Sequence, residues 1–249
     1  MKSARWPFFL ILGTILFLSG GFISLDWSRL FLFDHPVDQY KDVLVTKWIT
    51  SFLCSLLVWI TGSKFYISTK DSFHLRIAFV VTFAGDTAFF FDKDLVGIGL
   101  FALGQVLLTI RNSTGLVAFF KERRHDQSAL ILGLLILCVN ILILYFIFYP
   151  VMHMGTMFIA FSLYSLFLCV SVWVGCLAPR TGSFDPINGR LIAVAMICFY
   201  ACDVTVGLGL ALPEGTKQMV AANLTWVFYT PALTLLAISG YVQKRIWGT

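Results

Sequence analysis

The chain has 249 residues, of which 59% are hydrophobic and only 12% are charged, and its formal net charge is +5. Its mean hydropathy of +0.87 lies outside the range of soluble domains and is typical of a polytopic membrane protein. These values exclude a soluble globular fold, and the lipid bilayer is expected to be the solvent for most of the chain.

Eight apolar segments follow one another along the chain, each close to the length that a helix needs to cross a hydrocarbon core of about 30 Å. They are predicted at residues 7–25, 43–61, 74–91, 95–110, 128–149, 153–177, 190–212 and 218–242. No linker is long enough to separate a soluble domain. The sequence therefore predicts an all-α fold, a polytopic membrane bundle of eight transmembrane helices that forms a single transmembrane domain over residues 1–249.

Two details of this assignment stay open. The fourth segment is short, and the stretch "RNSTGLVAFF" after it either extends that helix or lies at the membrane interface. The first segment is also compatible with a cleaved signal peptide, but no A-x-A-like site follows it. Its removal would also spoil the charge distribution described next, so we expect the first helix to be retained.

The distribution of positive charge predicts the orientation of the helices. With eight helices, both termini and the loops at 62–73, 111–127 and 178–190 share one side, and that side carries most of the 18 Lys and Arg residues. Because cytoplasmic loops carry the excess of Lys and Arg, we expect both termini in the cytoplasm. The net charge is thus a topology signal, and no nucleic-acid partner is expected. The location predicted is a multi-pass integral membrane protein, in the cell membrane if the source is bacterial.

Two aspartates interrupt the apolar segments, Asp86 in "FAGD" and Asp203 in "YACD". A carboxylate at membrane depth costs several kcal/mol unless it is paired, protonated or hydrated, so each is a candidate functional group. The alternative is a structural hydrogen bond between helices. At 1.5 Å per residue, both carboxyl groups lie about 18–20 Å from the cytoplasmic edge. We therefore expect the two acids at one depth in parallel helices.

Other polar residues fall close to that depth. Gln105, Tyr164 and Tyr229 lie about 15–17 Å below the outer edge, and Lys47 lies about 6 Å below it. These residues are compatible with one pocket that opens towards the outer leaflet, although Lys47 could instead snorkel to the headgroups. Asn140 is expected to form a hydrogen bond between helices.

Neither the histidines nor the cysteines indicate a metal site. The histidines lie in or beside four different loops without metal-ligand spacing, at His35, His74, His125 and His153. The six cysteines all fall inside apolar segments and form no CxxC pair, which favours a packing role. No metal and no organic cofactor is expected.

The order of the polar residues resembles the lysoplasmalogenase family, the YhhN-like membrane proteins. Lys47 in "TKWITSFL" corresponds to the Lys of a family Lys-Pro in helix two, and Gly85-Asp86 corresponds to Gly-Asp in helix three. In "FALGQ", Phe101 is kept from Phe-x-x-x-His in helix four, and Gln105 replaces the His. The resemblance covers nearly the whole chain.

The last two helices carry the rest of the resemblance. Cys202-Asp203 corresponds to Ser-Asp in helix seven. In "FYTPA", Tyr229 is kept from Tyr-Tyr-x-x-Gln in helix eight, whereas the Gln is absent. Both acids of the family pattern are therefore present, while several of their partners differ.

The resemblance implies hydrolysis of the vinyl-ether bond of lysoplasmalogen, the ethanolamine or choline form, to a fatty aldehyde and a glycerophospho-base. Protonation of an enol ether at carbon creates an oxocarbenium ion that water captures, so the reaction needs one acid and one anion. Asp203 is assigned as the acid and Asp86 as the anion, with the reverse assignment left open. Substrate or water binding is assigned to the other four polar residues, Lys47, Gln105, Tyr164 and Tyr229.

Two other functions compete with this interpretation. Intramembrane acids also occur in carriers, so a small-solute or lipid transporter is one alternative, although paired Gly/Pro interruptions of helices are absent. A lipid-binding membrane protein without turnover is the other. A metal-dependent amidase of the ceramidase type would need converging histidines, which the sequence does not provide.

Overall fold

The computed structural model of the chain describes residues 6–32, 41–60, 67–122, 126–152 and 155–242. Within these ranges the protein is helical, and no strand occurs. Eight of the helical stretches are long and apolar enough to cross a membrane. The predicted all-α bundle of eight spanning helices and the multi-pass integral membrane location are therefore confirmed.

The spanning helices agree with the predicted segments in number and order. They are α1 (Trp6–Leu32), α2 (Lys41–Ile60), α3 (Thr69–Phe90), α4 (Asp94–Asn112), α6 (Gln127–Ile143), α8 (Thr156–Leu177), α9 (Pro186–Ala211) and α10 (Thr216–Ser239). The span that begins with α6 continues through a π-helical turn, η3 (Leu144–Phe148), into α7 (Tyr149–Met152). Short helices outside the spans are α5 (Leu116–Glu122) and the 3-10 turn η4 (Ala178–Arg180).

Several helix ends differ from the predicted ones because polar residues extend the helices beyond their apolar runs. α1 continues past residue 25 because the polar Asp26 is buried inside the bundle. α3 begins at Thr69, where Ser68 caps it by accepting a hydrogen bond from the backbone N–H of Asp71 at 3.0 Å. The predicted start of the sixth segment, residue 153, lies outside the described residues.

The stretch after α4 forms a helix of its own and does not extend α4. The chain turns at Gly115, whose φ of +82° lies in the left-handed region that favours glycine. α5 follows at once and buries Phe119. The turn explains why the apolar character of "GLVAFF" does not lengthen the fourth spanning helix.

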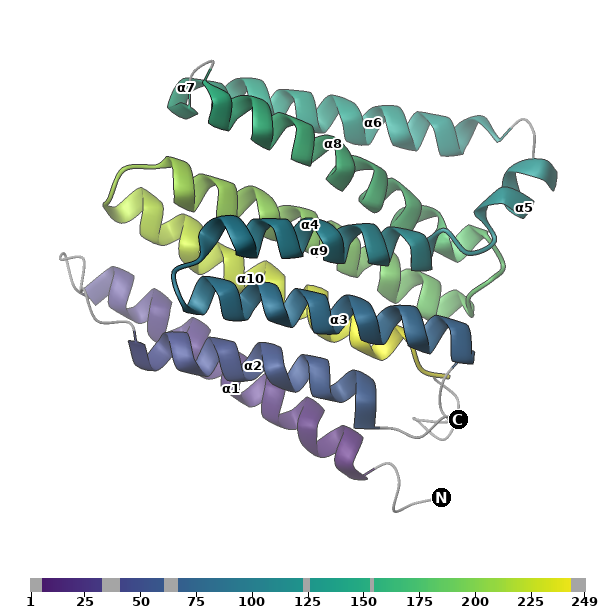
Figure 1. Cartoon of the computed structure of the whole chain (residues 1–249), viewed down its shortest axis with the longest axis horizontal. Helices are drawn as coiled ribbons and strands as arrows, with labels where there is room; N and C mark the ends of the chain where they lie inside the picture. Colours follow the sequence, from purple (N-terminus) through teal and green to yellow (C-terminus); the bar gives the residue numbers. More distant parts are fainter. Residues whose placement is uncertain (1–5, 33–40, 61–66, 123–125, 153–154, 243–249) are drawn as a thin grey trace.

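Contacts between neighbours close most of the helices into a ring. Along this ring α1, α2, α3, α4, α8, α9 and α10 follow one another, and α10 returns to α1 and also packs against α2. α6 packs against α8 from outside the ring, and the two lie along one edge of the bundle (Figure 1). The interior of the ring is thus the place where side chains from distant parts of the sequence can meet.

The main apolar core fills one half of this interior. It takes residues from the beginnings of α1, α3 and α9 and from the ends of α2 and α10, among them Ile15, Phe79, Met196 and Leu236. We call this the basal end, at which α1 begins and α10 ends; the opposite end is the distal end. Buried apolar side chains thus fill the basal half of the interior.

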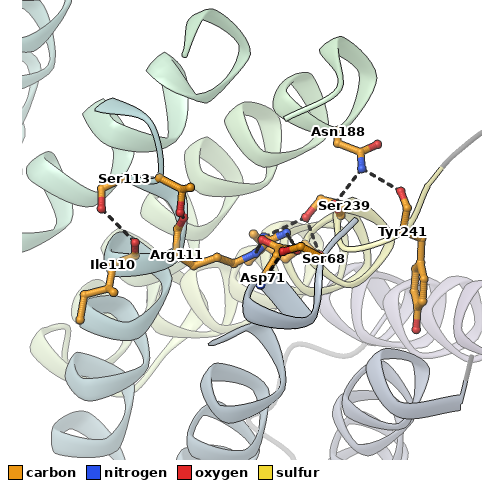
Figure 2. A network of polar contacts seen from close by, with 10 residues as sticks. Ser68, Asp71, Ile110, Arg111, Ser113, Asn188, Ser239 and Tyr241 are labelled. Carbon is orange, nitrogen blue, oxygen red and sulfur yellow. Dashed lines mark hydrogen bonds and ion pairs between the residues drawn. The ribbon is translucent and has the colours of Figure 1, made fainter. Parts of the chain in front are cut away.

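A buried polar network, the basal lock, ties four helices together beside that core (Figure 2). The guanidinium of Arg111 is fully buried and donates to both oxygens of Asp71, at 2.8 and 3.1 Å, and to the hydroxyl of Ser239 at 3.0 Å. Asn188 donates to the backbone oxygens of Ser239 and Tyr241, at 3.0 and 2.7 Å. The network joins α3, α4, α9 and the end of α10.

One glycine at the basal end permits a close helix contact, and a methyl group there is expected to destabilise the fold. A Cβ on Gly189 would stand 2.6 and 2.8 Å from the backbone Cα and N atoms of Pro179, which cannot rotate away. We expect Gly189→Ala to cost about 1–3 kcal/mol of stability. The measurement is the thermal melting temperature of the purified protein.

The same helix offers a matched control for that variant. A Cβ on Gly209, also in α9, would meet no atom within 4 Å. Because alanine favours helix over glycine, Gly209→Ala should leave the melting temperature unchanged or raise it slightly. Equal melting of the Gly189 and Gly209 variants would contradict the close contact with Pro179.

Candidate functional site

A cavity of about 260 Å³ lies in the distal half of the bundle, and α2, α3, α4, α8, α9 and α10 all contribute to its wall. Asp86 from α3 and Asp203 from α9 both line it. The structure thus brings the two aspartates to one cavity. The remaining lining residues are Leu44, Trp48, Phe89, Phe90, Ile98, Phe101, Phe161, Tyr164, Cys202, Val206, Gly207, Leu210, Thr225, Trp226 and Tyr229.

Asp86 is held by donors from two other helices. Tyr229 of α10 donates its hydroxyl to Oδ2 of Asp86 at 2.6 Å, and Ser51 of α2 donates to the same oxygen. Ser51 was not among the predicted site residues. Its position four residues after Lys47 places it on the same face of α2, and this spacing is the signal that could have identified it.

Asp203 has a different partner. Tyr164 of α8 donates its hydroxyl to Oδ2 of Asp203 at 3.2 Å, and the Asp203 side chain is buried. Each acid is therefore paired with one tyrosine, and each tyrosine comes from a helix that carries neither acid. Both tyrosines predicted at this depth do line the cavity, where they contact the acids directly.

Aromatic rings make up much of the cavity wall. The ring centroids of Trp226 and Phe101 lie 5.3 and 5.9 Å from that of Tyr229. Gly85 makes room for this arrangement, because a Cβ there would stand only 2.8 Å from the ring of Phe101. The Gly-Asp pair of the sequence therefore places an acid and a close helix contact side by side.

Lys47 lies outside the cavity lining, in a buried ion pair. Its Nζ is 2.6 Å from Oδ2 of Asp26 and 5.5 Å from the ring centroid of Trp226. Asn223 of α10 fixes the other side of the pair by donating to the backbone oxygen of Asp26 at 3.2 Å. Lys47 therefore does not snorkel to the surface. It pairs with Asp26 and does not join Asp86 and Asp203 in the lining of the cavity.

Asp26 is the partner that sequence reasoning missed. It lies directly after the predicted end of the first helix, at residue 25, and so was not counted among the intramembrane acids. Its signal in the sequence is a lone acid at the border of an apolar run, "ISLDW".

Gln105 also lies away from the cavity lining. Its Oε1 accepts a hydrogen bond from Ser171 at 3.0 Å, which joins α4 to α8. Asn140 forms the predicted hydrogen bonds between helices, donating to Ser165 at 3.1 Å and accepting from Tyr200 at 2.8 Å. Of the four residues assigned to substrate binding, the structure thus brings Tyr164 and Tyr229 to the cavity but not Lys47 or Gln105.

The described part of the chain contains no group of three His, Cys, Asp or Glu side chains that could hold a metal ion. Three of the four histidines, His35, His125 and His153, lie outside the described residues.

A comparison with protein-family models, with curated proteins and with solved structures finds no match to this chain. The resemblance to the lysoplasmalogenase family consequently rests on the residues of the sequence alone.

The Asp26–Lys47 pair gives a prediction that separates a structural ion pair from a substrate ligand. Lys47→Met should lower stability by about 3 kcal/mol or more, because it leaves Asp26 as an uncompensated buried charge. The double variant Asp26→Asn/Lys47→Met should recover most of that loss. The measurement compares the melting temperatures of Lys47→Met, Asp26→Asn and the double variant. Additive effects would mean that the two side chains do not depend on each other.

Proposed function

We propose that this protein is an integral membrane hydrolase that cleaves the vinyl-ether bond of a lysoplasmalogen to a fatty aldehyde and a glycerophospho-base. The observation that carries the proposal is that Asp86 and Asp203 line one largely apolar cavity, each with a tyrosine as hydrogen-bond donor. The many apolar residues of the lining offer an alkenyl chain an environment like the interior of the bilayer.

The reaction requires the two carboxyl groups in different protonation states. Asp86 accepts hydrogen bonds from Tyr229 and Ser51, whereas Asp203 accepts one from Tyr164. Because donors stabilise the ionised form of a carboxyl group, the larger number of donors favours Asp86 as the carboxylate. Asp203 then serves as the acid, which is the assignment favoured from the sequence.

The steps follow from this assignment. Asp203 gives its proton to the carbon of the double bond that does not carry the ether oxygen. The π electron pair of the double bond forms the new C–H bond. The oxocarbenium ion that results is stabilised by the carboxylate of Asp86. Water attacks the cationic carbon, as in glycoside cleavage, and its proton returns to Asp203, which restores the acid. The hemiacetal then breaks: its hydroxyl proton moves to the glycerol oxygen as the bond between that oxygen and the carbon is cleaved, which leaves the aldehyde.

The test is release of aldehyde from lysoplasmenyl-ethanolamine or lysoplasmenyl-choline by the purified protein. The matched control substrate is the saturated ether lipid with the same headgroup, which has no double bond to protonate and should release nothing. In D2O the aldehyde should carry one deuterium on the carbon next to the carbonyl. Absence of aldehyde from the vinyl ether would refute the proposal. Retention of the lipid without turnover would favour a lipid-binding protein, and gradient-driven uptake into proteoliposomes would favour a transporter.

A further inference from the structure

The cavity has a composition that vinyl-ether cleavage alone does not require. Eight of its 17 lining residues are aromatic and two are aspartates, and none of these described residues is Lys, Arg or His. The nearby cation, Lys47, has its charge matched by Asp26 at 2.6 Å. The wall therefore combines acids with ring faces and offers no positive side chain of its own.

Each of the two carboxyl groups receives its hydrogen bonds on one oxygen only. Both donors to Asp86 reach Oδ2, and Tyr164 reaches Oδ2 of Asp203. The described residues thus give no hydrogen bond to Oδ1 of either carboxyl group. Oδ1 of each carboxyl group is therefore left for a ligand in a cavity that both side chains line. A permanent cation binds with both groups ionised, so on binding Asp203 gives up the proton that it carries in the proposed reaction.

The rings add a second attraction for positive charge. The face of an aromatic ring attracts a cation within about 6 Å of its centroid, most strongly where water is excluded. Three rings of the wall contact one another. The ring centroid of Tyr229 lies 5.3 Å from that of Trp226 and 5.9 Å from that of Phe101. Aromatic rings and carboxyl groups in one wall match an ammonium centre, which carries its charge on an apolar surface.

We propose that the cavity binds the ammonium centre of single-chain cationic amphiphiles, with the charge between the two aspartates and the rings and the alkyl chain along the apolar wall. The cavity of about 260 Å³ leaves room for one small ammonium group. This binding goes beyond the proposed function, because the ligand is held and not cleaved. It shares the physical basis of that function, since groups that stabilise an oxocarbenium ion also stabilise a permanent cation.

The test compares three ligands with the same chain: hexyltrimethylammonium, hexanol and hexyl sulfate. Binding to the full-length protein in maltoside micelles is measured by calorimetry, and the cation is expected to bind about tenfold or more tightly than hexanol, with hexyl sulfate weakest. Asp86→Asn and Asp203→Asn should each weaken the cation about tenfold or more and leave hexanol unchanged. Phe101→Leu keeps an apolar side chain but removes a ring face, and should also weaken the cation selectively.

The matched control is Asp92→Asn, which removes the same charge from an exposed position just beyond α3. Asn tolerates the positive φ of 56° at this residue, so the variant should fold and bind the cation like the wild type. Equal binding of the cation and hexanol, or cation binding that survives both cavity aspartate variants and Phe101→Leu, would overturn the inference. Cation binding without aldehyde release would keep it and refute the proposed function; aldehyde release without charge preference would do the reverse.

Discussion

Asp203→Asn is expected to lower the rate of vinyl-ether cleavage about 10²–10⁴-fold, because Asn keeps the shape of the carboxyl group but cannot deliver a proton to carbon. Asp86→Asn is expected to lower it about 10²–10³-fold, because the cation loses the charge that stabilises it. Both variants are measured as initial rates of aldehyde release at saturating substrate. In D2O, the residual aldehyde from Asp86→Asn should still carry one deuterium on the carbon next to the carbonyl, because Asp203 still protonates that carbon.

Controls for these variants must separate chemistry from folding. Asp92→Asn changes an exposed acid at the same end of α3 and should retain the wild-type rate. Tyr164→Phe and Tyr229→Phe remove one hydrogen bond from each acid and should have smaller effects than the aspartate variants, because the carboxyl groups remain. Each variant is included only if it elutes as a single folded species. Cleavage at the wild-type rate by both Asp86→Asn and Asp203→Asn would refute the two-aspartate mechanism.

The number of helices and the shared site of the two acids could be predicted from the sequence. Membrane thickness fixes the length of an apolar span, so eight spans can be counted directly. The rise per residue then places Asp86 and Asp203 at similar depth. The presence of both acids in the lining of one cavity agrees with that expectation.

The direction in which each polar side chain points could not be predicted in the same way. Depth placed Gln105 and Tyr164 at one level, yet Tyr164 contacts Asp203 while Gln105 accepts from Ser171. The difference is set by rotation of each helix about its axis, and that depends on packing against several neighbours. Helices that are apolar on nearly all sides carry little periodic signal of which face is buried.

Asp26 shows a second limit. An apolar window ends at the first charge, so the segment was expected to stop at residue 25, although α1 continues to Leu32. The ion pair with Lys47 makes the buried acid tolerable, and its partner lies in the next helix. A lone acid at the edge of a span thus becomes interpretable only when the partner is found in space.

The largest effect on stability is expected at Arg111. Arg111→Met should cost about 3–5 kcal/mol, because it leaves the carboxylate of Asp71 buried without its partner. It also removes the donor to Ser239, so that α3, α4 and α10 lose their common contact at the basal end. Melting temperatures at one fixed scan rate measure the loss, since membrane proteins often unfold irreversibly.

Two further variants distinguish the geometry of the basal lock from its charge. Arg111→Lys keeps the charge but not the planar fork that reaches both oxygens of Asp71, so it should still melt well below the wild type. The double variant Asp71→Asn/Arg111→Met removes both charges and should be more stable than Arg111→Met. Lys121→Gln, an exposed basic residue in α5, serves as control and should change stability by less than about 0.5 kcal/mol. Full rescue by lysine would show that charge alone holds the basal end together.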